Sequence, residues 1–169
     1  FLYLDGHVRV YHGRHDIPYA HVARMRLAQS ATSDYWVNDT AGDPLFVVTA
    51  EANEGMAKML PALLKEIRGL VGDRRLTVVF DRGGWSPRLF QEILDLKFDF
   101  LTYRKGASPR VPKKKFKIAT EKIDGREITY TLADQEIRLL DGRLHLRQVT
   151  RLTDDGHRTP VITSRRDLS

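Results

Sequence analysis

The chain has 169 residues, of which 41% are hydrophobic and 30% charged, the composition of a globular protein of about one domain. It contains no cysteine and no apolar run near the roughly 20 residues of a membrane-spanning helix, which excludes disulfide frameworks, cysteine zinc sites and transmembrane helices. Residues 104–169 hold 16 lysines and arginines against 9 acids, whereas residues 1–103 hold 12 against 13. This asymmetry predicts a nearly neutral core joined to a part that binds a polyanion, with a basic solvated surface as the alternative.

The first expected strand contains Leu2-Tyr3-Leu4-Asp5-Gly6, in which an aspartate follows an apolar run. In one interpretation Asp5-Gly6 is a tight hairpin turn, because Asp-Gly between alternating runs is a strong hairpin signal. In the other, Asp5 is a carboxylate that a strand holds at the floor of a metal site. Residues 1–13 do not decide between the two interpretations of Asp5.

Residues 34–52 are expected to form a hairpin around a Thr-Ala-Gly-Asp-Pro turn. A helix follows, because apolar residues from 56 to 71 recur at the i, i+3, i+4, i+7 spacing of one helix face. Asn53 is the expected N-cap of this helix and Gly72 the residue after its end. Pro61 lies inside the pattern and predicts a kink or a later helix start.

Residues 76–80 form a short apolar run that is typical of a strand covered on both faces, and the run ends at Asp81. Ser86 and Pro87 then have the positions of an N-cap and a first helical residue. Another strand is expected within residues 98–106. This order favours an α/β fold with a mixed sheet and crossover helices. Taken alone, Asp81 could be only a residue of a strand-to-helix loop.

After residue 106 the helical spacing of apolar residues ends. Residues 109–117, PRVPKKKFK, are expected to be a basic linker. Alternating strands then surround three Asp-Gly pairs, at 124–125, 141–142 and 155–156, which we assign to tight turns. The pattern predicts an antiparallel meander of five or six strands with its cations on the polar face.

Two carboxylates at the ends of apolar strands can converge if those strands are neighbours, and Mg²⁺ needs only one or two carboxylates besides substrate phosphates. A histidine metal site is the rival, but its members match no structural zinc spacing and form no helical pair. The four histidines concerned are His7, His12, His15 and His21.

The motifs LYLDGHVRVYHG, TVVFDRGG with its following helix, FLTYRKG and the β-rich stretch after it resemble bacterial insertion-sequence DDE transposases over nearly the whole chain. The resemblance implies a ribonuclease-H-like catalytic core in residues 1–106 and a basic β-rich insertion in residues 107–169. It implies that Asp5 and Asp81 are the first two catalytic acids and bind Mg²⁺ or Mn²⁺. The third acid of the family is a glutamate on a helix after the insertion, which we expect beyond Ser169.

Glu121, Glu127 and Glu136 fall in the meander and are not credible substitutes for that third acid. By itself the fragment is therefore expected to be inactive. The function that the resemblance implies for the parent protein is DNA transposition, in which a phosphodiester at the transposon end is hydrolysed and the freed 3′-hydroxyl attacks target DNA. The alternatives are a metal-dependent nuclease of the same fold and a catalytically inactive DNA-binding remnant.

The expected partner is double-stranded DNA, bound by a homodimer in the cytoplasm, and no membrane is expected. Backbone phosphates are expected to contact five basic residues, which makes binding dependent on salt: Arg104, Lys105, Lys113, Lys114 and Lys115. For Arg82, contact with DNA and pairing with a carboxylate stay open. Trp36 and Trp85 are expected to pack in the protein.

Overall fold

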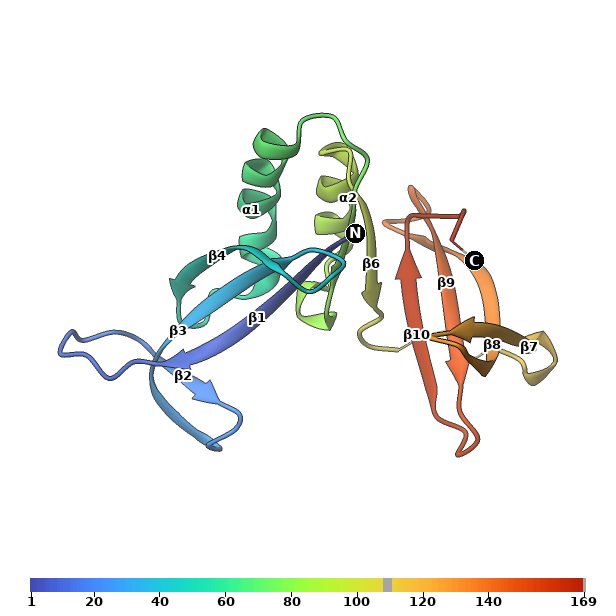
Figure 1. Ribbon diagram of the computed structural model, residues 1–169, viewed down its shortest axis with the longest axis horizontal. Coiled ribbons are helices and arrows are strands. Elements are labelled where there is room, and N and C mark those ends of the chain that lie inside the picture. Colours follow the sequence, from blue (N-terminus) through green and yellow to red (C-terminus); the bar gives the residue numbers. More distant parts are fainter. Residues whose placement is uncertain (108–110, 169) are drawn as a thin grey trace.

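A computed structural model of the chain describes residues 1–107 and 111–168 (Figure 1). Its elements are β1 (Leu2–Val10), β2 (Tyr19–Val22), β3 (Leu27–Asn38), β4 (Pro44–Glu51), α1 (Met56–Val71), β5 (Thr77–Phe80), the 3₁₀ turn η1 (Arg82–Gly84), α2 (Pro87–Asp95), β6 (Asp99–Tyr103), the 3₁₀ turn η2 (Lys113–Lys115), β7 (Lys117–Ile123), β8 (Arg126–Leu139), β9 (Leu144–Leu152) and β10 (Arg158–Thr163).

The described strands form one mixed sheet in the order β2-β3-β1-β5-β6-β10-β9-β8-β7, and β4 also pairs with β3. Strands β1, β5 and β6 are parallel to one another, and the other pairs are antiparallel. Helix α1 follows the antiparallel strands and leads into β5, and α2 connects β5 to β6. The predicted mixed sheet with crossover helices is confirmed, as is the hairpin of residues 34–52, which is β3–β4.

Helices α1 and α2 lie side by side on one side of the sheet (Figure 1). Each helix turns an apolar stripe toward the strands, with Leu60 and Leu64 of α1 and Phe90 of α2 no more than 1% exposed. Phe90 stacks on Phe100 of β6 with ring centroids 4.7 Å apart. Burial of these side chains, at about 1.5–3 kcal/mol each, is the main force that holds the helices on the sheet.

The start of α1 differs from the prediction. The helix begins at Met56 with Gly55 as its N-cap, and Pro61 lies within it, so the expected later start is wrong. Asn53 is not the cap: its φ is 73°, and its side-chain amide donates a hydrogen bond to the Tyr19 carbonyl over 2.9 Å. Proline removes only one N–H from the helix, and packing of the buried stripe outweighs that loss.

The other helix ends agree with the predictions. Gly72 follows α1 with a φ of 62°, a left-handed conformation that glycine adopts without strain. Ser86 caps α2, since its Oγ accepts a hydrogen bond from the Leu89 N–H over 3.4 Å, and Pro87 is the first helical residue.

Strand β1 continues without a break through Asp5 and Gly6, which pair with Trp36 and Tyr35 of β3. The hairpin interpretation of Asp5-Gly6 is therefore wrong. A hairpin would have paired the two halves of this stretch with each other, whereas both halves find a longer partner in β3, more than twenty residues later in the chain.

The meander contains four described strands, β7 to β10, fewer than the five or six expected. The reason is β8, whose 14 residues cross the polar Ala133-Asp134-Gln135 segment without turning. All three Asp-Gly turns are confirmed: each joins two successive strands, and the glycines at 125, 142 and 156 have φ values of 78°, 87° and 82°.

Strand β10 pairs with β6, so the meander extends the sheet that carries the helices. The division into domains at residue 106 stays a prediction, and residues 109 and 110 of the expected linker lie outside the described residues. None of the described helices is long and apolar enough to cross a membrane.

Candidate active site and basic groove

Asp5 lies in the middle of β1 with its side chain exposed. Side chains alternate along a strand, so Asp5 lies on the opposite face from Leu2 and Leu4, which are 5% and 4% exposed and pack under α1 and α2. Its partner Trp36 is 38% exposed on the same open face, so the packing expected for this tryptophan is only partial. Pairing with β3 continues through Asp5, and pairing with β5 ends at the residue before it, Leu4.

Asp81 directly follows Phe80, the last residue of β5. Its Oδ1 accepts a hydrogen bond from the Gly83 N–H over 2.7 Å, and its carbonyl accepts one from the Thr102 hydroxyl over 3.0 Å. A Cβ at Gly83 would lie 2.8 Å from Oδ1, and a Cβ at Gly84 would lie 2.6 Å from the Phe80 ring. Both glycines of Asp-Arg-Gly-Gly thus suit the tight turn in which the Asp81 carboxylate accepts the hydrogen bond from the Gly83 N–H.

The two aspartates occupy neighbouring strands at matching positions. In the parallel β1–β5 pair, Leu4 is the partner of Phe80, and Asp5 and Asp81 are the next residues of the two chains. Adjacent strands are separated by about 4.8 Å. The structure therefore makes the backbones of Asp5 and Asp81, which lie 76 positions apart in the sequence, neighbours at the same edge of two strands. That their carboxylates converge on one cation stays a prediction.

Tyr35 supports this site from β3, and the sequence analysis missed it. It is 6% exposed, and its hydroxyl donates a hydrogen bond to the Glu54 carbonyl. Burial, followed by the negative charges of Glu54 and Asp81, raises the pKa of the Tyr35 phenol. Its ring lies against Gly6, where an added Cβ would be 2.9 Å from Cε1. The glycine after Asp5 was the available signal, because it leaves room for this ring.

Within the described residues, no group of three or more histidine and acidic side chains is placed to hold a metal ion. The glutamates of the meander, Glu121 in β7 and Glu127 and Glu136 in β8, belong to strands at the far end of the sheet from β1. The assignment of Asp5 and Asp81 to a cation site therefore stays a prediction.

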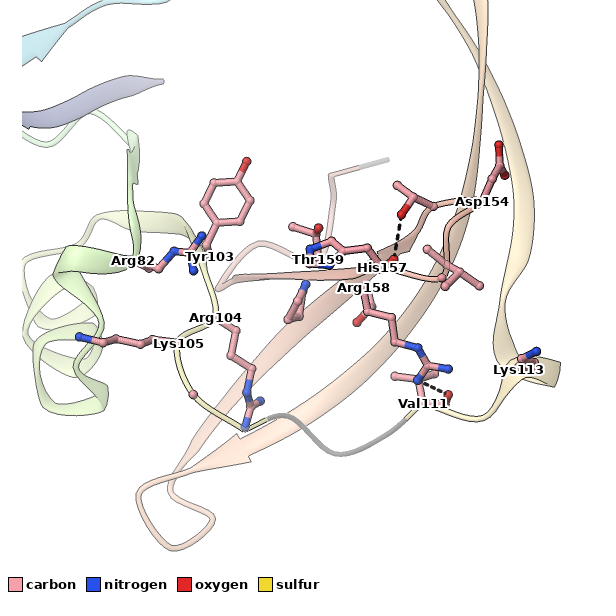
Figure 2. Close-up of a pocket in the computed structure, with 16 residues that line it drawn as sticks. Arg82, Tyr103, Arg104, Lys105, Val111, Lys113, Asp154, His157, Arg158 and Thr159 are labelled. Atoms are coloured by element: carbon pink, nitrogen blue, oxygen red, sulfur yellow. Dashed lines mark hydrogen bonds between the residues drawn. The ribbon is translucent and has the colours of Figure 1, made fainter. Parts of the chain in front are cut away.

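A basic groove of about 720 Å³ opens between the end of β6 and the β9–β10 hairpin (Figure 2). Its lining includes Arg82, which directly follows Asp81, together with Lys105, Lys113 and Arg158. Among the described lining residues, Asp154 is the sole acid. The groove therefore carries a strong positive charge, and its lining includes the residue that follows Asp81 in the chain.

The five predicted DNA-contact residues are not equivalent. Lys105 and Lys113 line the groove, whereas Lys114 and Lys115 are exposed on η2 outside it. Arg104 lines the groove too, but its Nη1 donates a 2.8 Å hydrogen bond to Oε1 of Gln148 in β9. Burial lowers the pKa of the Arg104 guanidinium. Arg104 thus connects β6 to the meander.

Two further residues, Trp85 near Arg104 and Arg158 in the groove, bear on the sequence analysis. Trp85 packs edge-on against Phe90 with ring centroids 5.3 Å apart, as expected of a packing residue, and Arg104 lies 5.7 Å from its ring. Arg158 was not singled out from the sequence. Its Nη1 donates a 2.9 Å hydrogen bond to the Val111 carbonyl, so it holds this residue of the expected linker at the groove wall. Only the pairing of β10 with β6 brings Arg158 here, and no local pattern signals that pairing.

Fold and site together define an α/β protein with two aspartates at neighbouring positions of adjoining parallel strands and a basic groove whose lining includes Arg82. Residues 1–167 match the model of a family described as "Transposase protein", and the chain belongs to this transposase family. The family prediction made from the sequence motifs is confirmed at this level. A search of curated proteins found no match.

Among solved structures, the chain is similar to the piggyBac transposase in a cryo-EM structure of its synaptic complex with hairpin DNA. The TM-score is 0.60 at 12% sequence identity, and the similarity covers 99% of this chain and 33% of the other. At this identity the similarity concerns the fold alone. The chain spans about a third of the length of that transposase.

Proposed function

We propose that this chain is part of the catalytic unit of a DNA transposase of the DDE type, with Asp5 and Asp81 as two of its acids. The observation that carries the proposal is the pairing of Leu4 with Phe80, which makes the two aspartates neighbours on parallel strands. Family membership supports transposition as the reaction. The finer assignment to the bacterial insertion-sequence group comes from the resemblance of the motifs.

The strand order supports a ribonuclease-H-like core. Three antiparallel strands, β4-β3-β1, are followed by β5 and β6 parallel to β1, with α1 and α2 as the connections. This is the arrangement that the resemblance implies for residues 1–106, with Asp5 on its first strand and Asp81 after its fourth. The meander then corresponds to the β-rich insertion.

The two carboxylates fit a divalent cation such as Mg²⁺ or Mn²⁺. Both are exposed, and both offer the hard oxygen ligands that these ions prefer. Oδ1 of Asp81 is occupied by the Gly83 N–H, which orients the carboxylate and leaves Oδ2 free of hydrogen bonds from the described residues. A cation bound here supplies Lewis-acid activation of water and of the phosphodiester. The third acid of the family, a glutamate, is expected outside residues 1–169.

The protein's own residues bind and position the DNA. In the proposal, Arg82, Lys105 and Arg158 of the groove neutralise phosphates of the DNA backbone that reaches the two aspartates. Lys113, Lys114 and Lys115 extend this surface along η2. In the proposed reaction water attacks a phosphorus at the transposon end, and the 3′-oxygen leaves as a hydroxyl while the other product keeps a 5′-phosphate. This 3′-hydroxyl then attacks a phosphorus of target DNA, forms the new phosphodiester bond and displaces a 3′-oxygen of the target strand as a hydroxyl. A homodimer on DNA and a cytoplasmic location stay predictions.

Binding of Mn²⁺ to the 169-residue chain tests the proposed site. Electron paramagnetic resonance of added Mn²⁺ should show bound ion that Asp5→Asn and Asp81→Asn each weaken at least tenfold. Asp141→Asn is the control, because Asp141 lies in a distant turn with a φ of 55°, a conformation that asparagine accepts. Equal Mn²⁺ affinity in all four proteins would rule out the two aspartates as ligands.

The reaction itself is tested on the full-length protein with transposon-end DNA. A transposase should give both cleaved ends and strand-transfer products, and each aspartate variant should lose both by more than a hundredfold. Cleavage without transfer would identify the rival nuclease. Retained binding with neither product in the wild-type protein would identify an inactive DNA-binding remnant.

A further inference from the structure

A second cationic feature lies at the other end of the molecule from the groove. Strand β2 and the first residues of β3 form a hairpin in which Tyr19 pairs with Ser30 and Val22 with Leu27. Figure 1 shows this hairpin projecting from the sheet on the side away from β7 to β10. Its turn is closed by the Met25 and Arg26 N–H groups, which both donate to the Val22 carbonyl, over 3.0 Å and 2.9 Å.

The base of the hairpin is anchored. Ala20 and Ala31 form a small buried cluster with Ala52, and the Asn53 side chain donates its hydrogen bond to the Tyr19 carbonyl. Alanines pack closely and lose no rotamer freedom on burial, so the base is held without a large core. The unusual left-handed backbone at Asn53 is accounted for by this contact. The hairpin is therefore a fixed projection.

The side chains at the tip of this hairpin do not pack against the rest of the described protein. It presents Arg24, Met25 and Arg26 in sequence, with Met25 48% exposed and both arginines exposed. Within the described residues neither arginine has an ion pair or a side-chain hydrogen bond. No acidic residue occurs between positions 17 and 33. An apolar side chain between two unpaired cations is thus held out into solvent.

We propose that this tip binds in the minor groove of double-stranded DNA, with Arg24 and Arg26 in the groove or on its phosphates and Met25 between two base pairs. The inference rests on the proposed DNA transposase function and adds a second, separate contact with the duplex. Narrow minor grooves concentrate negative potential that attracts arginine, and apolar wedges such as methionine unstack a base step and bend the duplex. Exposed arginines alone, or an exposed methionine alone, would suit many partners. Their alternation on an anchored hairpin suits the minor groove of DNA.

The test uses the 169-residue chain and a short A·T-rich duplex that carries 2-aminopurine, whose fluorescence rises when its base step is unstacked. Wild-type protein should raise the fluorescence, and Met25→Ala should abolish the rise while it weakens binding less than about tenfold. The double variant Arg24→Ala/Arg26→Ala should make the slope of log affinity against log salt shallower by about two, because each lost arginine contact removes about one released counterion.

Lys65→Ala/Arg88→Ala is the matched control, since it removes two exposed cations from α1 and α2 and should leave slope and fluorescence unchanged. Wild-type-like fluorescence and salt slope in both tip variants would overturn the tip inference and leave the proposed function standing. The same holds if the tip variants change only self-association, which would make the hairpin a protein contact. If the wild-type chain bound no duplex at all, both the tip inference and DNA binding by this chain would fail.

Discussion

Replacing Gly6 by alanine tests the packing that holds the candidate site. The new Cβ would lie 2.9 Å from Cε1 of Tyr35, closer than carbon atoms approach in folded proteins. The ring cannot turn away easily, because it is 6% exposed and its hydroxyl is bound to the Glu54 carbonyl. Overpacking of this kind costs about 1–3 kcal/mol, and alanine recovers about 0.5–1 kcal/mol of backbone entropy. We expect a net loss of about 1–2 kcal/mol in the free energy of unfolding.

The measurement is urea denaturation followed by circular dichroism, with the midpoint compared at an unchanged m-value. Gly69→Ala is the control, because this glycine lies in α1 and a Cβ there meets nothing within 4 Å. It should stabilise the protein by up to about 1 kcal/mol. In the double variant Gly6→Ala/Tyr35→Leu the clash disappears. The double variant should therefore lose less unfolding free energy than the two single variants lose together. A Gly6→Ala protein as stable as wild type would refute the argument that Tyr35 and Gly6 determine each other.

Two further predictions concern charge. The raised pKa of Tyr35 means that the folded protein holds the phenolic proton more tightly than the unfolded chain, so this contribution to stability is present below pH 10 and is lost as pH rises above it. Unfolding free energies measured between pH 8 and pH 11 should therefore fall more steeply for wild type than for Tyr35→Phe, and parallel curves would contradict the assignment. Changing Lys113, Lys114 and Lys115 to glutamine should weaken binding to all duplex sequences alike and make the salt slope shallower by up to about three, as fluorescence anisotropy can measure. An unchanged slope would remove η2 from the DNA surface.

Local signals predicted the elements whose causes are local. The stripe of α1, the Ser86-Pro87 start of α2 and the three Asp-Gly turns were all recognised, because each depends on residues within a few positions of one another. The prediction from Pro61 was wrong for the same reason, because it considered only the local cost of a proline in a helix. The burial of the neighbouring residues Leu60 and Leu64 outweighs that cost.

Features that depend on distant partners could not be predicted in the same way. Residues 126–139 contain a polar interruption that predicts two strands, and one 14-residue strand forms because β9 offers a continuous partner to its second half and β7 to its first. The basic groove exists because β10 pairs with β6, which brings Arg158 near Lys105. The side chain of Asn53 likewise donates a hydrogen bond to Tyr19 of β2, 34 positions earlier in the chain.

The placement of Asp5 beside Asp81 combines both kinds of cause. The alternation of buried Leu2 and Leu4 with exposed Tyr3 and Asp5 decides which face each side chain takes, and this pattern is visible in the sequence. A slip of one residue in β1 would turn the Asp5 carboxylate into the core, at a cost of several kcal/mol, and expose both leucines. The core therefore selects a single register, in which Leu4 pairs with Phe80. Any function of the carboxylate pair thus depends on hydrophobic packing on the opposite face of the sheet.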